Sequence, residues 1–232
     1  GRIASAAARA GRDPDEITLV AVTKTRSPAI IGAAYDLGLR HYGENRVEEA
    51  EPKLPELPPD IVWHMIGHIQ SRKAKRVAPI FQMVHSVDSV KLARRLDRAC
   101  EGRTRPVPVL LECNVSGEQA KYGFEADRWE EDGAQRKVLW TAVEQVLTLP
   151  NLQVQGLMTM APIVVEPEQA RPVFVRLRQL RDGLAAAFDQ GDWRHLSMGM
   201  TDDFEVAIEE GATLVRVGRA IFDPTQPATC KI

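Results

Sequence analysis

Eight apolar, β-rich runs recur along the chain at intervals of about 30 residues, and helix-like segments lie between them. The predicted strands are Ile17–Lys24, Arg40–Gly43, Ile61–Ile66, Met83–Val87, Val107–Asn114, Leu152–Thr159, His195–Gly199 and Thr213–Gly218. Eight such units predict a single (β/α)8 TIM barrel that fills residues 1–232 as one domain. A doubly wound open sheet is the alternative, but no Gly-x-Gly-x-x-Gly follows the first strand.

Four segments between these runs predict helices. Apolar residues at helical spacing place them at Ser89–Cys100, Val138–Thr148, Pro172–Phe188 and Asp202–Glu210. We expect Asp88 or Ser89 to cap the first of them, Asp202 with Glu205 to form a capping pair on the last, and the polar stretch 127–137 to be a loop. The Ala- and Arg-rich residues 1–12 resemble a transit peptide, but Gly11 as a stop favours the last turns of a helix that begins before residue 1.

Composition excludes several classes of protein. Thirty basic and 32 acidic residues give a net charge of −2, so we expect no nucleic-acid partner. No stretch is long and apolar enough to predict a membrane-spanning helix. The three cysteines, Cys100, Cys113 and Cys230, have no metal or disulfide spacing, which is typical of a reducing, cytoplasmic environment.

Lys24 is the first candidate for chemistry, because it ends the apolar run that begins at Ile17. Burial at the end of a strand is expected to lower the pKa of its ammonium and to free an amine nucleophile for a carbonyl group. A lysine whose side chain extends to water is the competing interpretation.

Glycines follow the last two predicted strands and indicate an anion site. Gly199 comes just after Ser197, and Gly218 precedes Arg219. Barrels often bind phosphate after strands seven and eight, through backbone N–H groups. Tight turns and helix caps explain each glycine separately, so the local sequence leaves both interpretations open.

Two further side chains stand where a ligand would be contacted. Arg216 lies among apolar residues of the last strand and needs a partner there, either a ligand or an ion pair. Asn45 follows the second strand, where it could hold a ring hydroxyl or simply occupy a turn.

Other polar patterns are weaker. His64 and His68 have the i,i+4 spacing of metal ligands but flank a strand end and Gly67, which argues against zinc. The basic run 72–76 lacks interleaved aromatic residues and predicts a solvated helix face, with RNA binding a minor alternative. Asp202 and Asp203 are better explained as a helix cap and a first-turn acid than as catalytic carboxylates.

Together these stretches resemble the pyridoxal-phosphate homeostasis proteins, also described as alanine-racemase N-terminal-domain-like. The resemblance is carried, in order, by Ala21-Val22-Thr23-Lys24, Tyr42-Gly43-Glu44-Asn45-Arg46, Trp63-His64-Met65-Ile66-Gly67-His68-Ile69-Gln70-Ser71-Arg72-Lys73, Gly156-Leu157-Met158-Thr159-Met160, Leu196-Ser197-Met198-Gly199-Met200-Thr201-Asp202-Asp203 and Val215-Arg216-Val217-Gly218-Arg219-Ala220-Ile221-Phe222. It implies a single barrel, similar to the N-terminal barrel of alanine racemase, that binds pyridoxal 5′-phosphate (PLP).

The resemblance also implies a role for each candidate residue. Lys24 would form a Schiff base with PLP, Arg216 would face the pyridine nitrogen, and Asn45 would lie near the 3-hydroxyl. The phosphate would be held by the segments that contain Ser197, Met198, Gly199, Gly218 and Arg219. Where the family often has a hydroxyl residue after the last glycine, this chain has Arg219, so either its guanidinium or only its backbone amide would contact phosphate.

Three functions follow as hypotheses. The resemblance implies a monomeric, cytoplasmic PLP carrier without strong catalysis, with PLP-requiring apo-enzymes as recipients. An arginine facing the pyridine nitrogen discourages its protonation, and the chain ends soon after Phe222-Asp223-Pro224, where racemases of this fold type add a β-rich domain. The alternatives are a PLP-dependent racemase or decarboxylase of low activity, and an aldolase that uses Lys24 without a cofactor.

Overall fold

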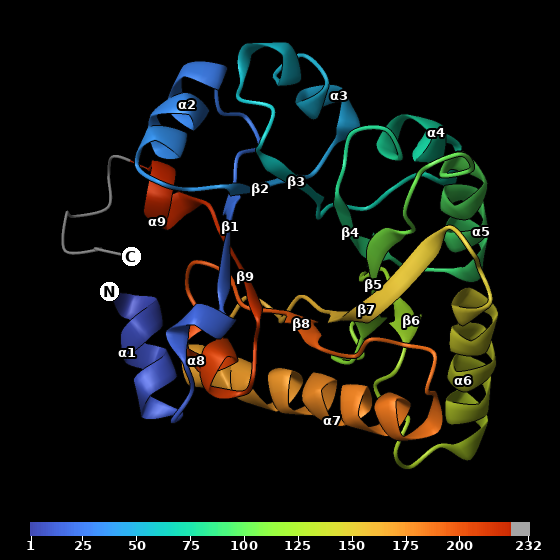
Figure 1. Cartoon of the computed structure of the whole chain (residues 1–232). Coiled ribbons are helices and arrows are strands. Elements are labelled where there is room, and N and C mark those ends of the chain that lie inside the picture. Colours follow the sequence, from blue (N-terminus) through green and yellow to red (C-terminus); the bar gives the residue numbers. More distant parts are fainter. Residues whose placement is uncertain (224–232) are drawn as a thin grey trace.

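The computed structural model describes residues 1–223 and shows a closed parallel barrel surrounded by helices (Figure 1). The barrel strands are β1 (Thr18–Val22), β2 (His41–Glu44), β3 (Val62–Met65), β4 (Met83–Val87), β5 (Val107–Asn114), β7 (Leu152–Met158), β8 (His195–Ser197) and β9 (Leu214–Val217). They pair in the order β1-β2-β3-β4-β5-β7-β8-β9, and β9 returns to β1 through the register Thr18↔Leu214 to Ala21↔Val217. The prediction of a (β/α)8 barrel is therefore confirmed.

The helices are α1 (Arg2–Arg9), α2 (Pro28–Asp36), α3 (Val47–Ala50), α4 (Ala74–Val77), α5 (Val90–Ala99), α6 (Gly133–Leu147), α7 (Arg171–Ala187), α8 (Phe204–Glu209) and α9 (Arg219–Phe222). Their inner faces pack on the outside of the barrel and form the larger hydrophobic core. A smaller cluster, formed by Val20, Met83, Leu110, Met158 and Leu214, joins β1, β4, β5, β7 and β9. Along these five strands, neighbouring side chains alternate between the two clusters, as a barrel requires.

All eight predicted strands are present. β4 and β5 have the predicted bounds, β2 is shifted by one residue, and the other five are shorter than predicted. β1 ends at Val22, so Lys24 lies beyond the strand in an exposed position. The expectation that burial desolvates the Lys24 amine is wrong, because the chain leaves the barrel wall before it reaches this residue. A short additional strand, β6 (Phe124–Glu125), pairs with the end of β5 and has no apolar run to predict it.

Two helix starts differ from the prediction. α6 begins at Gly133 rather than at residue 138, because Asp132 accepts hydrogen bonds from the N–H groups of Ala134 and Gln135. The carboxylate of Asp203 accepts instead from the N–H of Met200 (2.6 Å), which lies before the helix, and α8 begins at Phe204. The proposed capping pair of Asp202 with Glu205 is therefore wrong, whereas Ser89 does cap α5.

No helix of residues 1–223 has the length and hydrophobicity to span a membrane. Cys100 and Cys113 are free and buried. Pro224 and Cys230 lie outside the described residues.

Candidate ligand pocket

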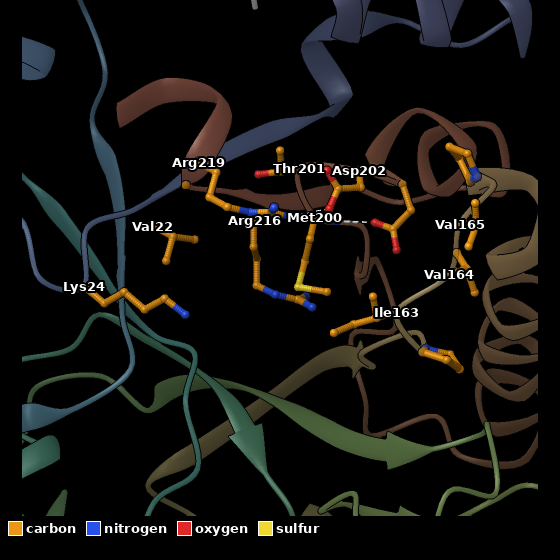
Figure 2. Close-up of a pocket in the computed structure, with 14 residues that line it drawn as sticks. Val22, Lys24, Ile163, Val164, Val165, Met200, Thr201, Asp202, Arg216 and Arg219 are labelled. Atoms are coloured by element: carbon orange, nitrogen blue, oxygen red, sulfur yellow. Dashed lines mark hydrogen bonds and ion pairs between the residues drawn. The ribbon is translucent and has the colours of Figure 1, made fainter. Parts of the chain in front are cut away.

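A pocket opens at the carboxyl ends of β1, β8 and β9, which is the end of a barrel where ligands bind. Its volume is about 440 Å³, enough for a small cofactor. Figure 2 shows Lys24 extending toward Arg216 from one side, with Met200 beside Arg216, Arg219 and Asp202 above, and the loop that carries Ile163, Val164 and Val165 opposite. Thus Lys24, Arg216, Gly218 and Arg219, four of the residues singled out in the sequence, meet at one pocket.

The segment that carries Lys24 is held by a buried cluster on the outer side of the barrel wall. Lys53 Nζ donates to Glu44 Oε1 (2.6 Å) and to the carbonyl oxygen of Thr23 (2.9 Å), while Thr23 Oγ1 donates to the same Glu44 oxygen (2.7 Å). Thr23 and Glu44 are completely buried, and burial raises the Glu44 pKa even though Lys53 and Thr23 oppose this effect. Thr25, on the other side of Lys24, has a positive φ of 63°, which is strained for a β-branched residue. The backbone on both sides of Lys24 is therefore specified by its surroundings.

Arg216 lies on β9 and is only 4% exposed. Nη1 donates to Ser197 Oγ (2.6 Å) and Nη2 donates to the carbonyl oxygen of Thr159 (2.9 Å). Burial lowers the Arg216 pKa to about 10, and the nearby Asp203 and Glu112 oppose this shift. The guanidinium remains charged at neutral pH and, being a pure donor, presents only N–H groups to the pocket.

Backbone N–H groups gather at one end of the pocket. Thr201, Asp202 and Gly218 line it, and none of their N–H groups has an acceptor among residues 1–223. The two loops are tightly packed, because a Cβ at Gly199 would lie 2.6 Å from Ala207 Cβ and one at Gly218 would lie 3.2 Å from Val22 Cβ. Unpaired N–H groups beside a guanidinium are suited to a phosphate.

Arg219 is exposed and forms an ion pair with Asp202 across this end of the pocket. Asp202 is thus the partner of Arg219 and not a helix cap. The pair links the loop after β8 to the beginning of α9, which follows β9. An exposed ion pair of this kind contributes little to stability, so Arg219 can leave Asp202 and contact another anion at little cost.

Four predicted site residues lie away from the lining of this pocket. Ser197, Met198 and Gly199 are buried beneath it, with Met198 in the core outside the barrel. Asn45 lines a small neighbouring cavity with Arg46 and His68. Contacts of these four residues with a cofactor stay predictions.

Sequence reasoning missed Glu112, a buried carboxyl group on β5. It is 4% exposed, and its Oε2 atom has no hydrogen-bond partner among the described residues. Burial, reinforced by Asp88, raises its pKa to about 7, while Arg216 opposes the shift. An acid inside an otherwise apolar strand was the signal that could have found it.

Glu112→Gln should change how the free energy of unfolding depends on pH. The pKa of Glu112 in the folded protein is raised from 4.5 to about 7. Between these two pH values the carboxyl group is therefore protonated in the folded state and ionised in the unfolded state. Wild type should therefore lose about 3 kcal/mol of stability as pH rises from about 4.5 to 7. Urea unfolding at pH 4, 5.5 and 8 should show this loss in wild type and in the exposed Glu130→Gln control, and not in Glu112→Gln. Equal pH profiles for wild type and Glu112→Gln would contradict it.

Comparison with known proteins shows to which family this chain is similar. The family model for the alanine racemase N-terminal domain matches residues 2–225. Two relatives described as pyridoxal phosphate homeostasis proteins cover 95% of the chain. They are the Aquifex aeolicus protein, 41% identical with 92% of its own length covered, and the Pseudomonas aeruginosa protein, 42% identical with 90% covered. The chain belongs to the pyridoxal phosphate homeostasis protein family.

A solved structure supports this assignment. PipY of Synechococcus elongatus, with PLP bound, is 35% identical and superimposes with a TM-score of 0.79 over 95% of this chain and 99% of PipY. The family resemblance inferred from the sequence motifs is therefore confirmed, together with the barrel that it implied.

Proposed function

We propose that this protein binds pyridoxal 5′-phosphate in the pocket at the ends of β1, β8 and β9 and takes part in PLP homeostasis as a carrier or buffer. One observation supports the proposal most strongly. An accessible amine (Lys24), an anion site and a buried guanidinium (Arg216) lie around one small pocket. Relatives that match nearly the whole chain are named for PLP homeostasis, and PipY is described with PLP bound.

The pocket fits each part of the cofactor. The unpaired N–H groups of the β8 and β9 loops, with Arg219, suit the phosphate. Val22, Ile163 and Met200 offer apolar contacts to a ring. The Lys24 amine suits the aldehyde, with which it would condense to a Schiff base and release one water molecule. PLP would supply a reactive aldehyde and a conjugated ring when bound.

Arg216 favours storage of the cofactor over catalysis. A guanidinium that faces the pyridine nitrogen donates a hydrogen bond to it and supplies no proton, because Arg216 remains an arginine cation at neutral pH. Proton-dependent PLP chemistry is weakened in that setting. The protein is accordingly proposed to be a cytoplasmic, single-domain carrier without strong catalytic activity, whose bound PLP is available to PLP-requiring apo-enzymes.

The proposal is tested by covalent trapping. Protein saturated with PLP should be yellow, and borohydride should abolish the colour and attach PLP to one lysine. Peptide mass spectrometry is expected to place the adduct on Lys24, and an unmodified protein would overturn the proposal. Absence of α-hydrogen exchange in amino acids incubated with the loaded protein in heavy water would support the carrier role, and rapid exchange would contradict it.

Arg219→Ala is expected to weaken PLP binding by roughly ten- to a hundredfold, because a charge-assisted contact with phosphate is lost. The loss should shrink at high salt. Titration of the cofactor-free protein with PLP at two ionic strengths measures both effects. Asp202→Asn is the matched control, since it frees Arg219 from its ion-pair partner and should bind PLP at least as tightly. Wild-type affinity in Arg219→Ala would show that residue 219 contacts phosphate only through its backbone amide.

A further inference from the structure

A chain of hydrogen bonds joins three histidines and one serine. His41 Nδ1 lies 2.9 Å from His64 Nε2, His64 Nδ1 lies 2.9 Å from His85 Nε2, and His85 Nδ1 lies 2.8 Å from Ser197 Oγ. His64, His85 and Ser197 are at most 2% exposed, while His41 is half-buried. We call these four residues the histidine chain.

The histidine chain crosses the interior of the barrel and ends at Ser197, beneath the ligand pocket. Its histidines come from the neighbouring strands β2, β3 and β4, but Ser197 is on β8, which is separated from β4 by β5 and β7. Ser197 Oγ is also the acceptor of Arg216 Nη1, and Arg216 lines the pocket (Figure 2). The chain is therefore linked through Ser197 to an arginine that lines the pocket.

Arg216 determines the direction of every hydrogen bond in the histidine chain. A guanidinium only donates, so Ser197 Oγ accepts from it, and the serine hydroxyl can donate its own hydrogen to His85 Nδ1. His85 is then protonated on Nε2 and donates to His64 Nδ1. His64 in turn donates from Nε2 to His41 Nδ1.

The opposite direction leaves a buried hydrogen without a partner. If His85 Nδ1 donated to Ser197, the hydroxyl oxygen would accept two bonds, and its hydrogen would have no acceptor within residues 1–223. A buried polar group in that state is costly. Burial also lowers the pKa of His64 to about 3 and that of His85 well below its ordinary value, so both rings are neutral and carry one N–H each.

We propose that the histidine chain positions Arg216. In this chain His41, His64 and His85 are all held as Nε2–H tautomers, so the Ser197 hydroxyl donates its hydrogen to His85 and its oxygen accepts from the guanidinium. This arrangement fixes which N–H groups Arg216 presents to a ligand. That these N–H groups contact PLP rests on the proposed function, whereas the tautomers of the three histidines are a property of the protein without cofactor.

Nitrogen NMR of the histidine rings tests the proposal. The full chain, labelled with ¹⁵N in histidine and freed of cofactor, is examined at pH 7 through the two-bond couplings between ring nitrogens and ring hydrogens. Single His→Gln variants assign the signals. The expected result is a neutral Nε2–H pattern for His64 and His85, and an Nδ1–H or imidazolium pattern for either ring would overturn the proposal.

Variants test the role of Arg216 in ordering the histidine chain. Arg216→Met removes the pure donor that bonds to Ser197, so His64 and His85 should lose their single tautomer and show a mixture of both. Arg219→Met removes a guanidinium from the same pocket without touching the chain, and it should keep the wild-type pattern. His195, which contacts Thr213, serves as an internal reference. Retention of the single Nε2–H pattern in Arg216→Met would overturn the proposal.

Ser197 offers a second pair of variants should Arg216→Met fail to fold. Ser197→Ala removes the link between His85 and Arg216, and Ser197→Thr keeps a hydroxyl group. After saturation with PLP, the absorption maximum should shift in Ser197→Ala and return in Ser197→Thr. If PLP binds neither to wild type nor to the variants, the proposed function is wrong. The NMR measurement of the tautomers does not use PLP and tests the histidine chain independently. Identical spectra and tautomers in Ser197→Ala and wild type would refute the positioning role.

Discussion

Lys24→Ala should abolish the covalent attachment of PLP completely while leaving the barrel intact. Lys24 lies beyond the end of β1 in an exposed position and has no hydrogen-bond partner in the part of the chain that the structure describes, so its side chain contributes little to folding. The anion site is formed by the loops after β8 and β9 and does not include the lysine. Weaker, non-covalent binding of PLP should therefore remain.

Borohydride reduction followed by intact-mass measurement checks this expectation, and equilibrium dialysis measures the remaining binding. Lys121→Ala and Lys73→Ala are suitable controls because both lysines take part in other contacts, Lys121 with Glu118 and Lys73 with Glu48. Both variants should form the adduct as wild type does. An undiminished adduct in Lys24→Ala, mapped to another lysine, would show that the nucleophile is misassigned.

The barrel was predictable because its signals are local and repeated. Each buried parallel strand needs a run of apolar, β-branched residues, and such runs are visible without knowledge of their partners. β6 (Phe124–Glu125) was not predictable in this way, because two residues pairing with the end of β5 carry no periodicity. The start of α6 was misplaced for a related reason, since the cap made by Asp132 precedes the apolar face that locates the helix.

Parts of the candidate site were predictable from position along the strands. Lys24, Gly218 and Arg219 follow a strand and Arg216 lies one residue before the end of β9, all at the same edge of the barrel, so topology alone brings them together. The sequence left open whether Lys24 is buried or extends to water, because its exposure depends on where β1 leaves the wall.

Pairings across the barrel were not predictable at all. The partner of Ser197 is His85, 112 positions away, and nothing in either segment indicates the contact. The ion pair of Arg219 with Asp202 likewise depends on how two loops meet, whereas the sequence suggested a phosphate contact for Arg219 and a helix cap for Asp202.

Lys53→Met should cause the largest loss of stability of any change considered. Its ammonium is the partner of Glu44, which is completely buried, and Glu44 Oε2 already has no hydrogen-bond partner among residues 1–223. Removing one member of a buried pair typically costs about 3–5 kcal/mol, because the other charge is left unpaired. For a chain of this size the melting temperature should fall by roughly 10 °C.

Lys73→Met is the matched control, since Lys73 pairs with Glu48 at a partly exposed position (2.8 Å) and should cost less than about 1 kcal/mol. Burial already raises the Glu44 pKa, and this effect grows when Lys53 is absent. The deficit of Lys53→Met should therefore shrink as the pH falls and Glu44 takes up a proton. Thermal unfolding of both variants at pH 5 and 8 measures the two effects.

The double variant Lys53→Met with Glu44→Leu separates charge from packing. If an unpaired carboxylate causes the loss, removing it should restore much of the stability, because an apolar pair can replace a buried ion pair. PLP trapping on Lys24 should be impaired in the double variant even where stability is restored, since Thr23 loses its contacts with both Glu44 and Lys53. A double variant as unstable as Lys53→Met alone would show instead that the lysine stem fills space that methionine cannot.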